Sequence, residues 1–510
     1  MSGSLRQLEM SNAPIAPAKT GVPMAVKFGL GVLAFAILSA LIVGRPVRTL
    51  QDFDQPFYFT IAYDMDRYGV FSNGNLSQVD STVTRPPAGM FFGPVYPALV
   101  YAAMQLDPRF AEAVRCSVEA DRGHRDQASC ESDELPMRLF NCFALAVGTV
   151  AVASAAELIF SAMFSGVAIF IAAGLLALAA LAGEAEIFSY MMTEATIFCL
   201  YSMFAATSVR AWQSGRPRDY GVAGALLALL SLTKPSFLVQ FPLLLGLSAL
   251  WLSRRAASAR WPRQAAKPLL VFTLAFAAPI GGWIARNAVS VGKIGFTEEY
   301  GTATLIERFA YNDMTPREFF QAFPYCVPGV GALVFDHVNG TDSMHRFVYF
   351  TPGSFFNAGR DRRNALLERY GSLDPLLPRI VSDEMRTRWW RHLLVSIPLT
   401  WCGMWTGGIV SLFLVPLFGC ACWRALRTQQ PLFLLYAAPA LLNLVLVGLI
   451  GNHYTRYNLV LIGPYAVGAG ALIMRWLQDA HWRWRARGSR SSTAPSASAV
   501  SDGGSTSPRG

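Results

Sequence analysis

One carboxylate in this sequence is well placed for acid–base chemistry. Asp54 precedes an apolar set with helical spacing, at offsets of four, seven, eight and eleven: Tyr58, Ile61, Ala62 and Met65. Gly69 then ends the pattern, as a glycine does after a helix. We therefore expect Asp54 at a helix N-terminus, where the free N–H groups and the helix dipole favour an acidic side chain. A simple helix cap is the alternative role.

Other polar residues of both charge signs lie at the ends of apolar segments. They are Asp52, Arg85, Glu184, Glu186, Glu194, Lys234, Arg286, His453, Arg456 and Tyr457. Carboxylates can accept protons, and cations can hold an anionic group. Any one of these residues can also be an anchor that reaches the membrane surface. Their repetition at one membrane face favours a shared site.

The composition indicates a membrane protein. Of the 510 residues, 53% are hydrophobic and only 15% are charged, and the mean hydropathy is +0.34. A bilayer core of about 30 Å needs roughly 20 apolar residues per helix, and about ten segments approach that length. They are 25–44, 138–160, 165–183, 194–212, 219–233, 236–253, 268–285, 408–423, 431–450 and 459–477. We therefore predict an all-α polytopic membrane protein.

The basic residues predict the orientation of these segments. With the N-terminus inside, the inner connections carry Arg216, Arg260, Arg427 and Arg487 among others, which places both termini in the cytoplasm. This distribution also accounts for the net charge of +10 without a nucleic-acid partner.

The expected organisation has five parts. A cytoplasmic tail (1–24) precedes a membrane module (25–285) whose first outer loop is 45–137. An outer cap (286–392), C-terminal membrane helices (393–477) and a partly disordered cytoplasmic tail (478–510) follow.

The first outer loop carries two further features. The Met90–Leu106 stretch contains Pro94 and Pro97, and we expect it to be a helix on the outer surface. Cys116 and Cys130 have a spacing that suits a loop-closing disulfide, with a metal cluster around His124 as the alternative. Cys326 is expected to be unpaired, and Cys402 to be a small apolar residue beside a span.

The order of these motifs resembles the GT-C superfamily of membrane glycosyltransferases, and more closely the branch of aminoarabinose transferases and protein O-mannosyltransferases. The resemblance covers about residues 25–477. Besides the Asp54–Gly69 pattern, its motifs are Arg85-Pro86-Pro87, Gly93–Pro97, Met192-Thr193-Glu194, Leu232–Pro235, Trp283–Asn287 and Arg456-Tyr457-Asn458.

The resemblance implies transfer of a sugar from a polyisoprenyl phosphate to a lipid, glycan or protein, usually with inversion, at the outer face of the membrane. It implies a bacterial inner membrane with the site facing the periplasm. Asp54 would be the general base, and Glu194 would orient the acceptor or share a metal with Asp54. Arg85, Arg286 and Arg456 would bind the lipid phosphate.

Asp52, Tyr58, Lys234, His453 and Tyr457 are auxiliary candidates in this scheme. Gln55 stands where the family often has an acidic residue, so a divalent metal stays unassigned. A secondary transporter or a flippase of lipid-linked sugars is the alternative function, although such proteins typically carry ionisable residues near the bilayer midplane. A scaffold without catalysis would not need these charges.

Overall fold

The computed structural model describes residues 21–45, 53–74, 85–123, 125–126, 130, 133–255, 261–335, 345–347, 351–451 and 454–491. Within these ranges all regular secondary structure is helical. Two auxiliary candidates, Asp52 and His453, lie outside the described residues, as does His124 of the alternative metal cluster.

Eight of the described helices are long and apolar enough to cross a membrane. They are α2 (Met24–Ile42), α6 (Leu135–Phe160), α7 (Gly166–Gly183), α11 (Gln240–Arg255) with η4 (Pro235–Val239), α12 (Trp261–Ser290), α18 (Ser411–Arg427) with η9 (Gly408–Val410), α19 (Pro431–Ile450), and α20 (Ile462–Ser491) with η10 (Thr455–Leu461). The prediction of an all-α polytopic membrane protein is therefore confirmed.

The remaining two predicted spans are helices as well, but they are not among those eight. They form α9 (Glu194–Ser214) and α10 (Pro217–Thr233), which pack against each other. α9 also packs along α6, and α10 along α12. Because α9 faces protein on several sides, it carries hydroxyl-bearing side chains such as Ser202 and Ser208 in buried positions, which lowers its hydropathy.

The first outer segment folds as three short helices around an aromatic core. They are α3 (Gln55–Tyr68), α4 (Val95–Leu106) and α5 (Pro108–Asp121), which contact one another. Their shared core includes Phe59, Tyr96 and Phe110, all nearly inaccessible. The helix expected from Met90 begins only at Val95, because Pro94 and the preceding Gly93 lie in irregular chain.

The described residues contain two disulfides. The predicted Cys116–Cys130 bond is present, with 5.6 Å between the Cα atoms. A second bond, Cys326–Cys402, has a Cα–Cα distance of 4.9 Å, so the expectation of an unpaired Cys326 and a merely apolar Cys402 was wrong. The reason is that α17 (Leu377–Met404) brings Cys402 beside the end of α14 (Pro316–Tyr325), a neighbourhood that sequence separation conceals.

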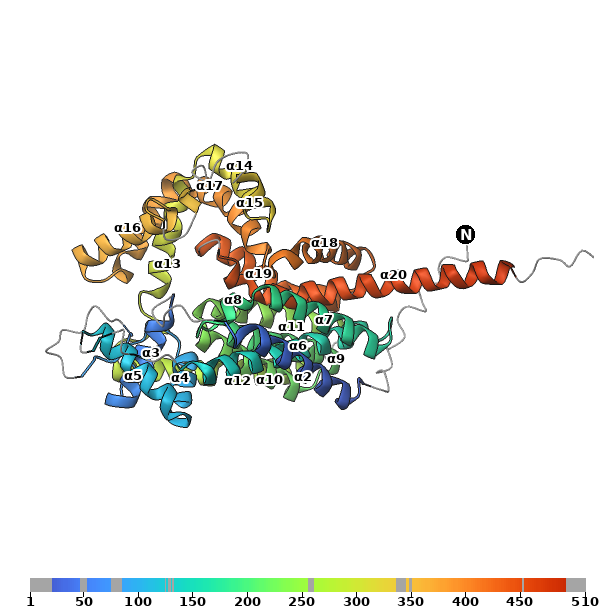
Figure 1. Cartoon of the computed structure of the whole chain (residues 1–510), viewed down its shortest axis with the longest axis horizontal. Helices are drawn as coiled ribbons and strands as arrows, with labels where there is room; N and C mark the ends of the chain where they lie inside the picture. Colours follow the sequence, from blue (N-terminus) through green and yellow to red (C-terminus); the bar gives the residue numbers. More distant parts are fainter. Residues whose placement is uncertain are drawn as a thin grey trace, which may run out of the picture.

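The second outer segment forms an arch of helices above the bundle, seen at the top of Figure 1. It contains α13 (Tyr300–Phe309), η5 (Ala310–Asp313), α14, α15 (Val330–Val334), α16 (Phe355–Tyr370), η8 (Asp374–Leu376) and the first half of α17. Fully buried Arg308 connects the arch to the membrane helices by donating to the Gly448 carbonyl at 2.9 Å and to Ser396 Oγ at 2.8 Å. α17 continues without a break through the boundary expected at residue 392.

The arrangement places the first outer segment at one end of the membrane helices. Figure 1 shows α3 to α5 at the left end of the bundle, while the far end of α20 projects beyond the bundle on the right. α20 runs to Ser491, so residues 478–491 of the predicted C-terminal tail are helical. The short helix α8 (Ala185–Phe188) lies between α7 and α9.

Candidate active site

Four separate chain segments bring charged side chains together at one place. Asp54 precedes α3, Glu194 is the first residue of α9, Lys234 follows α10, and Arg456 lies in η10. The Arg456 guanidinium lies between the two carboxylates: Nη2 is 3.3 Å from Asp54 Oδ2, and Nη1 is 3.7 Å from Glu194 Oε1. Residues up to 402 positions apart thus form one charge cluster.

Asp54 is placed as predicted, at the N-cap of α3, and the helix ends at Gly69 in the left-handed conformation with φ of 63°. Its side chain makes no capping hydrogen bond, and its carboxylate contacts Arg456 instead. The Asp54 side chain is 42% exposed, whereas those of Arg456 and Glu194 are 7% and 5% exposed. Asp54 is therefore the carboxylate of the cluster that an external molecule can reach.

Glu194 is buried at the start of α9. The free N–H groups and the dipole of that helix favour a carboxylate at this position, and Thr193 Oγ1 lies 3.5 Å from Glu194 Oε2. The role as a helix-terminal charge is thus compatible with the ion pair to Arg456.

Arg456 is held from several sides. Nη2 donates to Tyr457 Oη at 3.2 Å, and Nη1 lies 3.1 Å from the Met192 sulfur. The rings of Phe53, Tyr454 and Tyr457 lie 5.0 to 5.5 Å from the guanidinium carbon. This enclosure fixes the orientation of the guanidinium toward Asp54 and Glu194.

Lys234 has a different environment. Its ammonium nitrogen lies 3.9 Å from the centroid of the Tyr457 ring, and it forms no ion pair with any carboxylate in the described part of the chain. Burial, together with the neighbouring Arg456 charge, lowers the pKa of Lys234 to about 8, even though the Glu194 and Asp54 carboxylates act in the opposite direction.

The backbone around Lys234 explains how it is placed. Lys234 is extended, with φ of −140° and ψ of 114°, as expected before Pro235. Gly93 packs so closely on the preceding turn that a Cβ atom there would collide with the Leu232 carbonyl oxygen. The glycine of the Gly93–Pro97 motif therefore allows the first outer segment to lie against the end of α10.

An aromatic wall lies beside the charge cluster. Tyr58 contacts the rings of Phe92 and Tyr96 at centroid distances of 5.3 and 4.9 Å, and Tyr300 of the arch lies 6.1 Å from Phe92. Burial, followed by the negative charges of Asp54 and Glu194, raises the pKa of Tyr58 well above its ordinary value, so the phenol stays protonated.

Tyr300 and Tyr454 were not identified from the sequence. Both reach the cluster from segments that flank the second outer region and the last span, and no local pattern marks them. The Trp283–Asn287 motif contains Arg286 and its side-chain partner Asn287, but the two carbonyls that Arg286 also binds, of Gly89 and Phe71, are specified by no sequence pattern.

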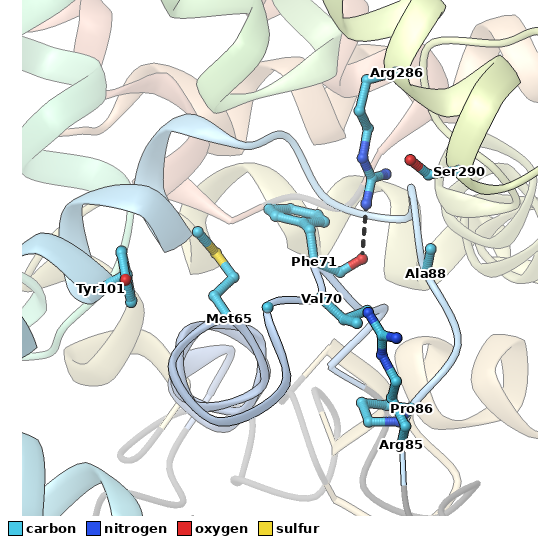
Figure 2. Close-up of a pocket in the computed structure, with 10 residues that line it drawn as sticks. Met65, Val70, Phe71, Arg85, Pro86, Ala88, Tyr101, Arg286 and Ser290 are labelled. Atoms are coloured by element: carbon cyan, nitrogen blue, oxygen red, sulfur yellow. Dashed lines mark hydrogen bonds between the residues drawn. The ribbon is translucent and has the colours of Figure 1, made fainter.

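Arg85 and Arg286 lie elsewhere, at the opposite end of α3. They line a cavity of about 580 Å³ together with Met65, Gly69, Val70, Phe71, Pro86, Ala88, Tyr101 and Ser290. Figure 2 shows the Arg286 guanidinium pointing to the Phe71 carbonyl. At 1.5 Å per residue, α3 separates this cavity from Asp54 by roughly 15–20 Å. The three arginines expected at one phosphate thus occupy two places.

Arg286 acts within that cavity as a clamp on the first outer loop. Nη1 donates to the Gly89 carbonyl at 2.5 Å and Nη2 to the Phe71 carbonyl at 2.9 Å. Gly89 N also donates to the Phe71 carbonyl at 2.8 Å. Arg286 therefore closes the neck of the loop that carries Arg85.

The side chains at the charge cluster do not fit a divalent metal. A guanidinium already lies between Asp54 and Glu194, and a metal there would place two cations against each other. Gln55, at the position where an acid was expected, is buried and accepts a hydrogen bond from Met191 N at 2.8 Å. Within the described residues, no group of three His, Cys, Asp or Glu side chains could hold a metal ion.

Comparison with known proteins gives distant structural similarity. No protein-family model and no curated protein matches the chain. It is similar to archaeal oligosaccharyltransferase AglB from Archaeoglobus fulgidus in complex with an inhibitory peptide and a dolichol-phosphate, with 11% identity and a TM-score of 0.45 over 91% of the chain. It is also similar to an Archaeoglobus fulgidus oligosaccharyltransferase in the apo form, with 13% identity and a TM-score of 0.36 over 89% of the chain.

The chain spans about half the length of both structures, 52% in each case.

Proposed function

We propose that this protein is a membrane glycosyltransferase of the GT-C type, which moves a sugar from a polyisoprenyl phosphate to a lipid, glycan or protein acceptor at the outer face of a bacterial inner membrane. The observation that carries the proposal is the accessible Asp54 carboxylate beside buried Arg456 and Glu194, at one end of the membrane helices. The motifs that carry the resemblance to that superfamily supply these same residues.

The proposed chemistry is a displacement at the anomeric carbon. The acceptor oxygen forms a bond to that carbon, the bond from the carbon to the phosphate oxygen breaks, and the acceptor proton passes to Asp54. A positioned general base contributes about 10²- to 10⁴-fold in rate. The phosphate leaves with one more negative charge than it had in the donor, so fixed cations nearby stabilise the transition state.

The positions of the charges support this reaction over a transport function. The cluster is formed at helix ends, by residues that precede α3, begin α9, follow α10 and precede α20. A lipid-linked donor can keep its polyisoprenyl chain in the bilayer while its head group reaches this end of the bundle. Asp54 has the exposure that an incoming acceptor needs.

Asparagine at position 54 tests the general base. Asp54→Asn keeps the size of the side chain but removes the proton acceptor, so sugar transfer should fall by about two to four decades. Glu112→Gln is the matched control, because Glu112 is a 59% exposed carboxylate on α5. An Asp54→Asn variant that keeps more than half of its activity would rule out this role for Asp54.

The substrate has to be identified with the native protein. Mass spectrometry of lipid-linked sugars and envelope glycans, in cells with and without the protein, should reveal an accumulated donor and an unmodified acceptor. In cells without the protein, an unmodified acceptor together with lipid-linked sugars retained on the inner leaflet would instead indicate a flippase.

A further inference from the structure

The cations at and near the site differ in their partners and in their positions. Arg456 is engaged by Asp54 and Glu194, and Arg286 donates to two backbone carbonyls and to Asn287 Oδ1. Arg85 lines the cavity at the opposite end of α3 from Asp54. Only Lys234 combines a position in the charge cluster with the lack of an ion-pair partner among the described residues.

The charge balance of the cluster shows what such a lysine can do. Asp54 and Glu194 carry two negative charges, and Arg456 and Lys234 carry two positive ones. Since both carboxylates contact Arg456, the Lys234 charge is balanced only at a distance. A partly buried ammonium without a hydrogen-bonded counter-ion is unfavourable, and an incoming anion relieves this cost.

We propose that Lys234, stacked on the Tyr457 ring, is the residue that binds the phosphate of the lipid donor, and that Arg456 instead positions Asp54 and Glu194. This inference rests on the proposed glycosyltransferase function and assigns a phosphate-binding residue within it. It also differs from the roles predicted from the sequence, where Arg85, Arg286 and Arg456 were the phosphate ligands and Lys234 was an auxiliary residue.

Proton transfer and phosphate release are coupled in this arrangement. When Asp54 accepts the acceptor proton, it loses its negative charge, and at the same step the phosphate gains one. The total charge near Lys234 and Arg456 therefore stays constant while its location moves from the carboxylate to the leaving group. Fixed cations that serve both locations need no rearrangement during the reaction.

Binding of decaprenyl monophosphate, compared with decaprenol, tests this assignment. Both probes carry the same lipid chain, and only the first carries the phosphate. The full-length protein in detergent should prefer the phosphate probe. Lys234→Met should reduce that preference by about tenfold to a hundredfold, the effect of losing one charge-assisted contact. Lys293→Met is the control, because Lys293 is a 58% exposed lysine paired with Glu298.

The outcomes distinguish this inference from the proposed function. If the wild-type protein does not prefer the phosphate probe, both the function and the inference are wrong. If Lys234→Met keeps the full preference, Lys234 is not the phosphate ligand, although the function can stand. Equal affinity of wild type and variant for decaprenol shows that the variant is folded and still binds the lipid chain.

The pH dependence of phosphate binding provides a second measurement, in which the wild type is compared with Lys234→Arg, a variant that keeps the positive charge. The phosphate is already a dianion above about pH 7, since its second pKa is about 6. Deprotonation of Lys234, whose pKa is about 8, should weaken phosphate binding between pH 7 and 9.5 in the wild type. Lys234→Arg should bind with little change over this range, because arginine stays charged. The groups that face Lys234, namely Asp54, Glu194, Arg456 and Tyr457, are the same in both proteins. An identical decline in the Arg variant would overturn the assignment.

Discussion

Replacing Arg456 with methionine should destabilise the protein mainly through Glu194. Both side chains are buried, at 7% and 5% exposure, so the variant leaves a buried carboxylate without its partner. Removing one partner of a buried pair costs about 3–5 kcal/mol. The 3.7 Å separation is longer than a charge-assisted hydrogen bond, which favours the lower value of about 3 kcal/mol. Asp54 is 42% exposed and should add less than about 1 kcal/mol.

A double-mutant cycle measures this effect. Unfolding of the purified protein by sodium dodecyl sulfate should show the full loss for Arg456→Met. The double variant Arg456→Met/Glu194→Gln should come within about 1 kcal/mol of wild type, because both buried charges are then absent. Arg475→Met is the control: Arg475 is 39% exposed and pairs with Asp479 at 4.0 Å, so its loss should cost less than about 1 kcal/mol. Additive losses in the double variant would refute a direct Arg456–Glu194 interaction.

Three further predictions concern other parts of the structure. Gly93→Ala should displace the end of α10 and lower phosphate binding, whereas Gly301→Ala, in open space on α13, should change neither binding nor stability measurably in the same assays. Burial, with the Arg308 charge second, lowers the pKa of His392 to about 4; since the unfolded residue gains its proton near pH 6.5, stability should fall by up to about 3 kcal/mol between pH 6.5 and 4. His392→Gln should reduce that fall in thermal unfolding, and an unchanged pH profile would contradict it. Cys326→Ser opens a cross-link across 76 residues, so unfolding by sodium dodecyl sulfate should show a loss of up to about 4 kcal/mol, and wild type after reduction should match the variant.

Local signals predicted the features that depend on neighbouring residues. The helix after Asp54 and its end at Gly69 follow from apolar spacing and from the glycine conformation, and both are present. The Cys116–Cys130 bond could also be predicted, because the two cysteines are only 14 residues apart in one connection between apolar segments. In each case the physical cause lies within a short stretch of chain.

Features that depend on long-range packing could not be predicted. Cys402 reads as an apolar residue near a span, and only the position of α17 brings it to Cys326. Arg286 has the residue type of a phosphate ligand, but its guanidinium donates to the Gly89 and Phe71 carbonyls, at the opposite end of α3 from Asp54. The sequence pattern gives the residue type and its approximate height along the bundle, whereas the partner of each charge depends on how the helices pack.

The same distinction explains how this site can be built from weak motifs. Each of Asp54, Glu194, Lys234 and Arg456 lies at a helix end, so the length of its apolar segment places it near the same end of the bundle. This shared position along the bundle does not by itself determine which of the four charged residues binds a phosphate and which positions another side chain. Close contacts then separate their roles: Arg456 is enclosed between two carboxylates, while Gly93 brings the first outer segment against the turn that holds Lys234 over the Tyr457 ring. Gly93, which contacts no charged side chain, therefore helps to determine that Lys234 is the cation available to an anion.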